Sequence, residues 1–270
     1  MIIDARTNVM YRKWGPPSPK VAVLCVHGLG GHSGRWGFLG EALAQKNMAC
    51  YAVELKGFGE AEGLKGHVDS FQIYFDDIRA LRAIIKNDHP RGKVFLAGES
   101  FGGLLAFLLA VSDPGVCDGL ICLSPAFKSR LKFPARVYAS MIFCCLFHPR
   151  KQFTVPFCAP MCTRDTDYQK VMDGDQREHR FATARFLANS LAAQIRSQFL
   201  KGRLSLPTLF LLAGRDVMVD PGASLGIYKS LNVKDKTIVR YPEMAHALSI
   251  DRGREKVFED IAAWLEERAV

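Results

Sequence analysis

The order of apolar and polar positions predicts strands alternating with helices along most of the chain. Residues 70–86 have apolar side chains at helical spacing, and Ser70 stands where a helix N-cap is expected. Short, wholly apolar runs predict strands buried on both faces, which is typical of a mostly parallel sheet flanked by helices. The predicted strands are 21–26, 48–53, 93–97, 119–123, 208–213 and 237–241, and the other predicted helices are 36–46, 101–111 and 255–268.

The alternation stops after Pro125 and resumes near residue 206. We therefore predict an α/β core made of residues 1–124 and 206–270. Residues 125–205, here called the cap, contain helical or irregular segments with several prolines and are expected to lie over the sheet as an insertion.

Composition narrows the class of protein. The chain has 270 residues, 49% hydrophobic and 23% charged, which is ordinary for a globular protein. The N-terminus lacks the pattern of a signal peptide, and the longest apolar run, 137–147, is too short to span a bilayer. The eight cysteines lack zinc-site spacing, and several lie in apolar strand-like runs. We expect a reduced, cytoplasmic protein without a bound metal.

A Gly-x-Ser-x-Gly pattern places Ser100 between the predicted strand 93–97 and the predicted helix 101–111. By composition alone, about 0.1 such matches are expected, so the pattern needs support from its context. A serine at a sharp strand-to-helix turn has its hydroxyl exposed at the carboxyl edge of the sheet, and small neighbours permit the turn. Ser100 is therefore predicted to be a nucleophile rather than an ordinary helix N-cap.

An acid and a base follow Ser100 in the order that serine hydrolases of this topology use. Asp216 comes shortly after strand 208–213, and His246 follows strand 237–241. Both fall where open α/β sheets bind their ligands. Asp220 is the alternative acid, but it precedes Pro221 and suits a helix N-cap.

Backbone N–H groups are the usual donors to the oxyanion of an acyl-transfer reaction. We expect one from Phe101, directly after the predicted nucleophile, and one from Leu29 in the glycine-rich turn after strand 21–26. His27 lies at the end of that strand, and we predict a structural role for it rather than that of the base.

Five segments, HGLGGHSGRW, LKGFGEAEG, GESFGG, LAGRDVMVDP and MAHALSIDRGRE, resemble the monoacylglycerol lipase and lysophospholipase-like branch of the α/β-hydrolases. The resemblance covers nearly the whole chain and is loosest between Ser129 and Pro160. It implies a cap inserted after the sixth strand, no cofactor, and Ser100 as nucleophile, Asp216 as acid, His246 as base, and Leu29 and Phe101 as oxyanion donors. Glu99 departs from the family, where histidine often precedes the serine.

The net charge of +9 comes entirely from the cap, which has 14 Lys and Arg against 5 Asp and Glu. The apolar run 137–147 is flanked by basic residues, as in a helix that lies on an anionic membrane surface. We expect peripheral contact with the inner membrane surface, although a helix packed on the sheet with solvated charges would have the same sequence. No nucleic-acid-binding motif accompanies the charge, and the oligomeric state is left open.

The expected activity is cleavage of carboxylic esters of single-chain lipids, monoacylglycerol or lysophospholipid. Two other functions fit the same residues. One is a carboxylesterase or thioesterase for smaller soluble acyl compounds, and the other is a ligand-binding protein on a hydrolase scaffold.

Overall fold

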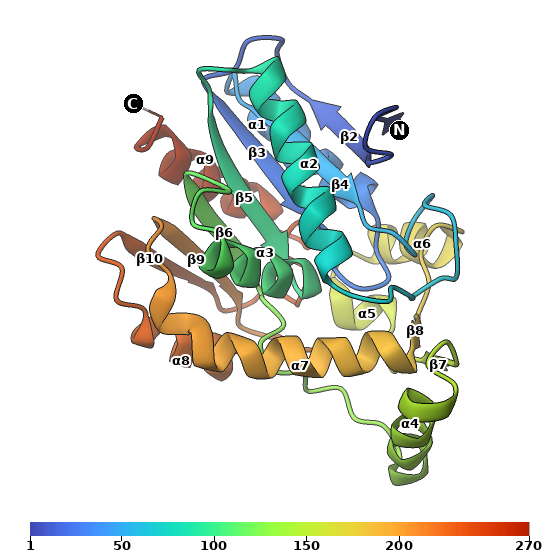
Figure 1. Ribbon diagram of the computed structural model, residues 1–270. Helices are drawn as coiled ribbons and strands as arrows, with labels where there is room; N and C mark the ends of the chain where they lie inside the picture. The colour runs from blue at the N-terminus through green and yellow to red at the C-terminus, as the bar shows by residue number, and fades with distance from the viewer. Residues whose placement is uncertain (270) are drawn as a thin grey trace.

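The computed structural model of the protein describes residues 1–269 and contains a central eight-stranded sheet (Figure 1). The strand order is β1-β2-β4-β3-β5-β6-β9-β10, with parallel pairing from β4 to β10 and antiparallel pairing of β1 and β2. The bounds are β1 Ile2–Ile3, β2 Met10–Trp14, β3 Val21–Val26, β4 Ala49–Glu54, β5 Lys93–Glu99, β6 Gly119–Leu123, β9 Thr208–Ala213 and β10 Lys236–Tyr241. The predicted α/β-hydrolase class of fold, with a mostly parallel sheet, is confirmed.

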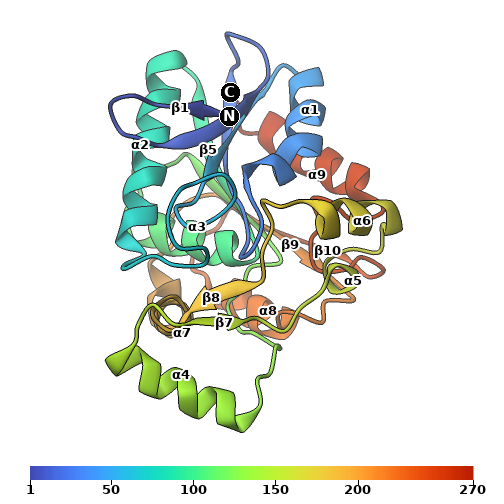
Figure 2. The same cartoon turned by 90° about the vertical axis from the view of Figure 1, so that its right-hand side faces the viewer.

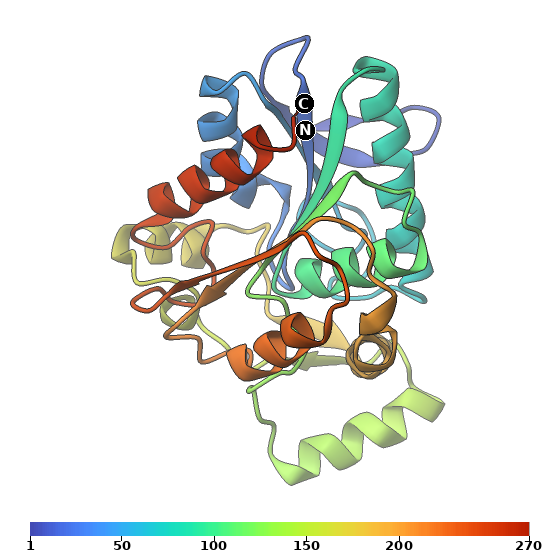
Figure 3. The ribbon, with the colours of Figure 1, turned by 90° about the vertical axis from the view of Figure 1, so that its left-hand side faces the viewer.

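Helices cover both faces of the sheet, which explains why strands such as β3, β4 and β6 are buried along their whole length. α2, α3 and α8 pack on one face, and α1 and α9 on the other, as Figures 1 and 3 show. The bounds are η1 Ser33–Trp36, α1 Gly37–Gln45, α2 Gln72–Asp88, α3 Phe101–Ser112, α8 Pro221–Ser230 and α9 Arg254–Glu266.

The observed elements follow the predicted ones with shifts of a few residues. The helix expected from Ser70 begins at Gln72, and the Ser70 hydroxyl accepts a hydrogen bond from the Gln72 N–H at 3.2 Å. The prediction missed β1 and β2, which extend the sheet at one edge. β1 has only two residues, both exposed, and β2 mixes polar with apolar residues and is mainly half-buried, so the pattern that predicts buried strands cannot detect them.

The cap follows β6 and lies beyond the carboxyl ends of the parallel strands (Figures 1 and 2). It contains α4 Ala135–Phe147, β7 Gln152–Thr154, α5 Ala159–Cys162, α6 Thr166–Gly174, β8 Phe181–Thr183 and α7 Ala184–Leu200. α7 packs against α3, whereas α4 projects farthest from the sheet. β7 and β8 form a small antiparallel ribbon that was not predicted. None of the helices in residues 1–269 is long and apolar enough to cross a membrane.

Candidate active site

Ser100 lies at a sharp turn between β5 and α3. Its backbone has φ 56° and ψ −119°, a conformation that side-chain-bearing residues rarely adopt. The neighbouring glycines are needed for space: a Cβ on Gly98 would overlap the backbone of Gly102, and a Cβ on Gly102 would overlap the Val26 carbonyl. The Gly-x-Ser-x-Gly pattern therefore has a steric origin, and the turn leaves the Ser100 hydroxyl facing a cavity under the cap.

The structure brings Ser100, His246 and Asp216 together, as their positions after β5, β10 and β9 predict. Ser100 Oγ lies 2.8 Å from His246 Nε2, and His246 Nδ1 lies 2.7 Å from Asp216 Oδ2. The other oxygen of Asp216 accepts the N–H groups of Met218 and Val219, each at 2.9 Å. These bonds fix the carboxylate, which in turn favours the tautomer with a proton on Nδ1 and a free Nε2.

Asp220, the alternative acid, and His27, the alternative base, lie elsewhere and have other partners. Asp220 is the N-cap of α8 and accepts the Gly222 N–H at 3.0 Å, so it is not the partner of the histidine. His27 is buried, accepts the Leu55 N–H on Nε2 at 3.1 Å, and donates from Nδ1 to the Gly28 carbonyl at 2.9 Å. Burial lowers its pKa, which suits a neutral ring joining two loops.

The glycine-rich turn after β3 runs beside Ser100. A Cβ on Gly28 would lie 3.2 Å from the Ser100 Cβ, so only glycine lets the turn come this close without displacing a neighbour. Within residues 1–269, the N–H groups of Leu29 and Phe101 donate no hydrogen bond to another protein group. Both residues border the cavity. The two N–H groups are thus available at the place where an oxyanion donor is needed.

Glu99 is buried beside Ser100 and attaches β5 to the loop that bears the histidine. Its carboxylate accepts the Ser249 N–H at 2.9 Å and the Ser249 hydroxyl at 2.7 Å. Burial raises the pKa of Glu99, and these two hydrogen bonds oppose that rise. The departure from the family's usual histidine therefore introduces a second link between the nucleophile turn and the histidine loop.

A cavity of about 560 Å³ opens above Ser100, between the sheet and the cap. Its side next to the triad contains polar groups, including Arg35 and Glu99. Away from the triad it is lined mainly by apolar side chains, among them Leu131, Phe133, Met141, Ile142, Leu187 and Leu191. Most of these come from α4 and α7, so the cap forms the apolar wall of the site.

Polar contacts between the cap and the core were not predicted. Arg35 binds Glu178 through two hydrogen bonds of 2.6 Å, and Asp251 binds Thr163 and Arg164. The Arg35–Glu178 partners are 143 positions apart in the chain, and those of Asp251 are 87 and 88 apart, so no local pattern marks them. The one local signal is the acidic residue five positions after His246, which resembles an ordinary cap of the following helix.

A nucleophile turn after a central parallel strand, a serine–histidine–aspartate chain and a cap over the carboxyl edge define the α/β-hydrolase class of serine hydrolases. The comparison with protein families agrees with this. Residues 17–253 match the profile of the hydrolase family described as serine aminopeptidase, S33, and the chain belongs to that family.

Individual relatives cover nearly the whole chain. A monoglyceride lipase of Rattus norvegicus is 27% identical, over 99% of this chain and 90% of the relative. Phospholipase YtpA of Bacillus subtilis is 24% identical, over 94% of this chain and 98% of the relative. The crystal structure of the monoacylglycerol lipase of Paleococcus ferrophilus superposes with a TM-score of 0.86 at 27% identity, covering 95% of this chain and 98% of that one.

Proposed function

We propose that the protein hydrolyses carboxylic esters of single-chain lipids, monoacylglycerols or lysophospholipids, through an acyl-enzyme on Ser100. The observation that carries this proposal is the position of Ser100. Its hydroxyl is hydrogen-bonded to His246 and also opens on an apolar cavity of about 560 Å³. Relatives named as monoglyceride lipases and a phospholipase support the same substrate class.

The first half of the reaction transfers the acyl group to the enzyme. His246 Nε2 accepts the Ser100 proton while Oγ forms a bond to the ester carbonyl carbon, and the carbonyl oxygen becomes an oxyanion. The N–H groups of Leu29 and Phe101 stabilise that oxyanion. Asp216 stabilises the imidazolium through its 2.7 Å bond to Nδ1. The tetrahedral intermediate then expels the alcohol, which receives the proton from Nε2.

The second half returns the enzyme to its starting state. His246 accepts a proton from a water molecule, whose oxygen attacks the acyl carbon. The same two N–H groups hold the second oxyanion. Collapse of the intermediate releases the fatty acid, and Ser100 Oγ regains its proton from His246.

The distribution of polar groups orients the substrate in this scheme. The headgroup lies near Arg35 and Glu99, and the acyl chain extends along the apolar side chains of α4 and α7. A chain in this part of the cavity is removed from water, and each buried methylene contributes about 0.8 kcal/mol to binding. The apolar lining therefore favours long acyl chains over short ones.

The outer face of α4 supports contact with a membrane surface. Phe143, Leu146 and Phe147 are all more than half exposed. Arg136 lies in the first turn of α4, and Lys132, Arg150 and Lys151 flank the helix. Within residues 1–269 none of these four forms an ion pair with an acidic group. Two other basic residues of the cap, Lys128 and Arg130, pair with Asp220 and are less available.

We infer that this apolar and basic face docks on anionic lipid from the cytoplasmic side. The apolar side chains would enter the acyl boundary while the four cations meet headgroups. The cavity lies directly behind α4, so docking would bring its apolar wall next to the lipid phase.

The central test is a hydrolysis panel of monoacylglycerols and lysophospholipids with varied acyl chains, run with the wild type and Ser100→Ala. We expect the wild type to prefer long chains and the variant to retain its fold while losing turnover by about 10⁴-fold or more. A fluorophosphonate probe should label the wild type at Ser100 only, because labelling requires an activated serine.

Other outcomes would replace the proposal. A preference for very short acyl chains would indicate a soluble carboxylesterase or thioesterase. Turnover of aminoacyl amides without ester cleavage would indicate a peptidase. A protein that binds lipid but is neither labelled nor active would be a ligand-binding protein on this scaffold.

A further inference from the structure

The loop that carries His246 is anchored on both sides of the histidine. The Ala247 N–H donates to the carbonyl of Cys162, the last residue of α5, at 2.8 Å. The Ala245 N–H donates to Asp251 Oδ2 at 2.7 Å. The first bond attaches the loop directly to the cap. The second attaches it to Asp251, so its effect depends on the groups that bind the Asp251 carboxylate.

The cap holds that carboxylate. Asp251 has a fully buried side chain, with 0% exposure. Its Oδ1 accepts the Arg164 N–H at 2.6 Å and the Thr163 hydroxyl at 3.1 Å, and its Oδ2 accepts Arg164 Nε at 2.9 Å. With the Ala245 N–H, these bonds use the four acceptor positions of a carboxylate. Asp251 therefore links the N–H of Ala245, the residue before His246, to cap residues 163 and 164.

Asp251 does not serve the helix that follows it. The N-cap of α9 is Gly253, and no side chain caps that helix. The Arg254 N–H bonds to the Asp251 backbone carbonyl, not to the carboxylate. Every side-chain hydrogen bond of Asp251 within residues 1–269 goes to the histidine loop or to the cap. This distribution separates Asp251 from an ordinary helix-capping aspartate.

We propose that Asp251 is a positioning residue that locks the histidine loop to cap residues 162–164, so that the cap sets the distance between His246 and Ser100. Asp251 does not border the cavity, and its cap partners lie outside α4 and α7, which form the apolar wall. Loosening this link should consequently lower the rate of the chemical step and leave substrate binding nearly unchanged. The inference rests on the proposed function, in which His246 is the base.

The experiment measures kcat and KM for a soluble ester, p-nitrophenyl butyrate, with kcat expressed per active site counted by fluorophosphonate titration. Asp251→Asn keeps the side-chain shape but replaces one acceptor oxygen by a donor. We expect it to lower kcat per labelled site about ten- to hundredfold, with KM changed less than about twofold. Arg164→Ala removes one side-chain bond to Asp251 and one to the Arg252 carbonyl, and it leaves Asp251 in place. We expect a loss of about threefold.

Asp165→Asn is the matched control. It breaks another carboxylate–arginine pair between cap and core, Asp165–Arg254 at 2.9 Å, but removes no bond to Asp251 or Ala245. Its kcat per labelled site should remain within about twofold of the wild type, because the histidine loop keeps both anchors. A comparable loss of kcat in Asp165→Asn would overturn the inference, since any disturbance of the cap would then suffice.

A purely structural role for Asp251 predicts a different result. Asp251→Asn would then yield fewer labelled sites and a lower Tm, with the wild-type kcat at each remaining site, and that result would also overturn the inference. The same titration tests the proposed function separately. If the wild type is not labelled at Ser100, the proposed function fails and the positioning role fails with it.

Discussion

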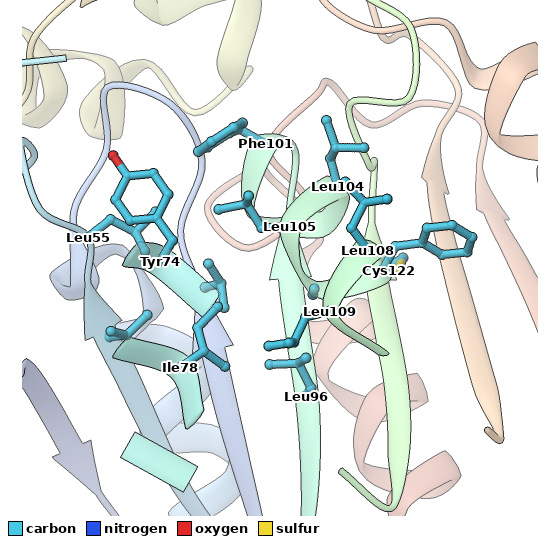
Figure 4. Packing of buried hydrophobic residues seen from close by; sticks show 14 of the residues in the cluster. Leu55, Tyr74, Ile78, Leu96, Phe101, Leu104, Leu105, Leu108, Leu109 and Cys122 are labelled. Carbon is cyan, nitrogen blue, oxygen red and sulfur yellow. The ribbon is translucent and has the colours of Figure 1, made fainter. Parts of the chain in front are cut away.

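Two helices of nearly equal length and similar apolar content, α3 and α4, have opposite environments. Every residue of α3 from Phe101 to Val111 is buried. The helix packs on the sheet and beside α2 (Figure 4), and α7 of the cap also packs against it. In α4 only Met141 and Cys144 are buried. A helix that is apolar on all sides usually belongs inside a protein, as α3 does. The exposure of α4 shows that its apolar side chains do not serve the core.

Apolar residues therefore have different roles in the core and in α4. In the core they remove surface from water and stabilise the fold. In α4, one side lines the cavity through residues such as Tyr138 and Ile142, and the other side, with Leu146 and Phe147, faces solvent. Exposed apolar residues gathered on one element are typical of a surface that meets a lipid or a partner. The same composition thus supports stability in one helix and ligand contact in the other.

The largest difference between α3 and α4 is expected in how much a substitution in each helix lowers the free energy of unfolding. Leu105→Ala in α3 removes a fully buried side chain, so we expect it to lower the free energy of unfolding by about 2–5 kcal/mol. Leu146→Ala in α4 removes a side chain that is 74% exposed, and we expect a change within about 0.5 kcal/mol. Urea unfolding of both variants measures the difference. Equal losses would mean that α4 is packed like α3 and that the comparison is wrong.

The core and the candidate site could be predicted because their signals are local. A strand buried on both faces is a continuous apolar run, and Ser100 directly follows such a strand, β5. His246 follows β10, an edge strand that is mostly half-buried but still has apolar residues at its centre. Parallel strands place their carboxyl ends at one edge, so the order of these residues along the chain predicts that they meet. β2 could not be predicted in this way, because its residues are mainly half-buried and mix polar with apolar types.

The contacts between cap and core depend on geometry that no local pattern contains. Arg35 and Glu178 each look like an ordinary surface charge in the sequence, yet their ion pair is nearly buried. Asp251 precedes a helix and resembles a cap residue, but its carboxylate binds Arg164. These pairs form only after the cap has folded over the sheet. Sequence patterns therefore predict which residues can react, but not which residues of the cap and core keep them in position.

A pH prediction concerns the polar attachment of the cap. His32 Nδ1 accepts the Gly34 N–H at 3.1 Å, and Nε2 lies 3.2 Å from Asp175 of the cap. Burial, assisted by nearby Arg177, lowers the pKa of His32 to about 4. Between pH 6.5 and pH 4 the unfolded chain binds a proton that the folded chain does not. Stability consequently falls as the pH falls through this range, by about 3 kcal/mol from this residue.

His32→Asn tests whether His32 makes the protein less stable as the pH falls. The asparagine oxygen can accept the Gly34 N–H as Nδ1 does, and it does not titrate. We expect the variant to lose less stability than the wild type between pH 7 and pH 4, by about 3 kcal/mol, in urea unfolding at both pH values. Parallel losses in the two proteins would show that His32 does not make the attachment of the cap acid-sensitive, and the contrast between cap and core would then rest on apolar packing alone.

The smallest expected effect concerns the outer face of α4. Arg150→Gln and Lys151→Gln each remove one cation beside the exposed apolar residues, and we expect each to lower partitioning onto anionic vesicles about fivefold at low salt. Turnover of a soluble short-chain ester should stay unchanged, because neither residue borders the cavity. Co-sedimentation with anionic and neutral vesicles measures the partitioning.

The matched controls are Lys20→Gln and Arg91→Gln. Both residues are exposed and lie just before the amino ends of β3 and β5, at the end of the sheet opposite the cap. Their loss removes the same charge from the protein, so a general attraction between a basic protein and an anionic surface would weaken equally in all four variants. If the face of α4 is the specific docking surface, only Arg150→Gln and Lys151→Gln should lower partitioning onto anionic vesicles. If the wild type does not prefer anionic over neutral vesicles at all, the exposed apolar face of α4 has another partner.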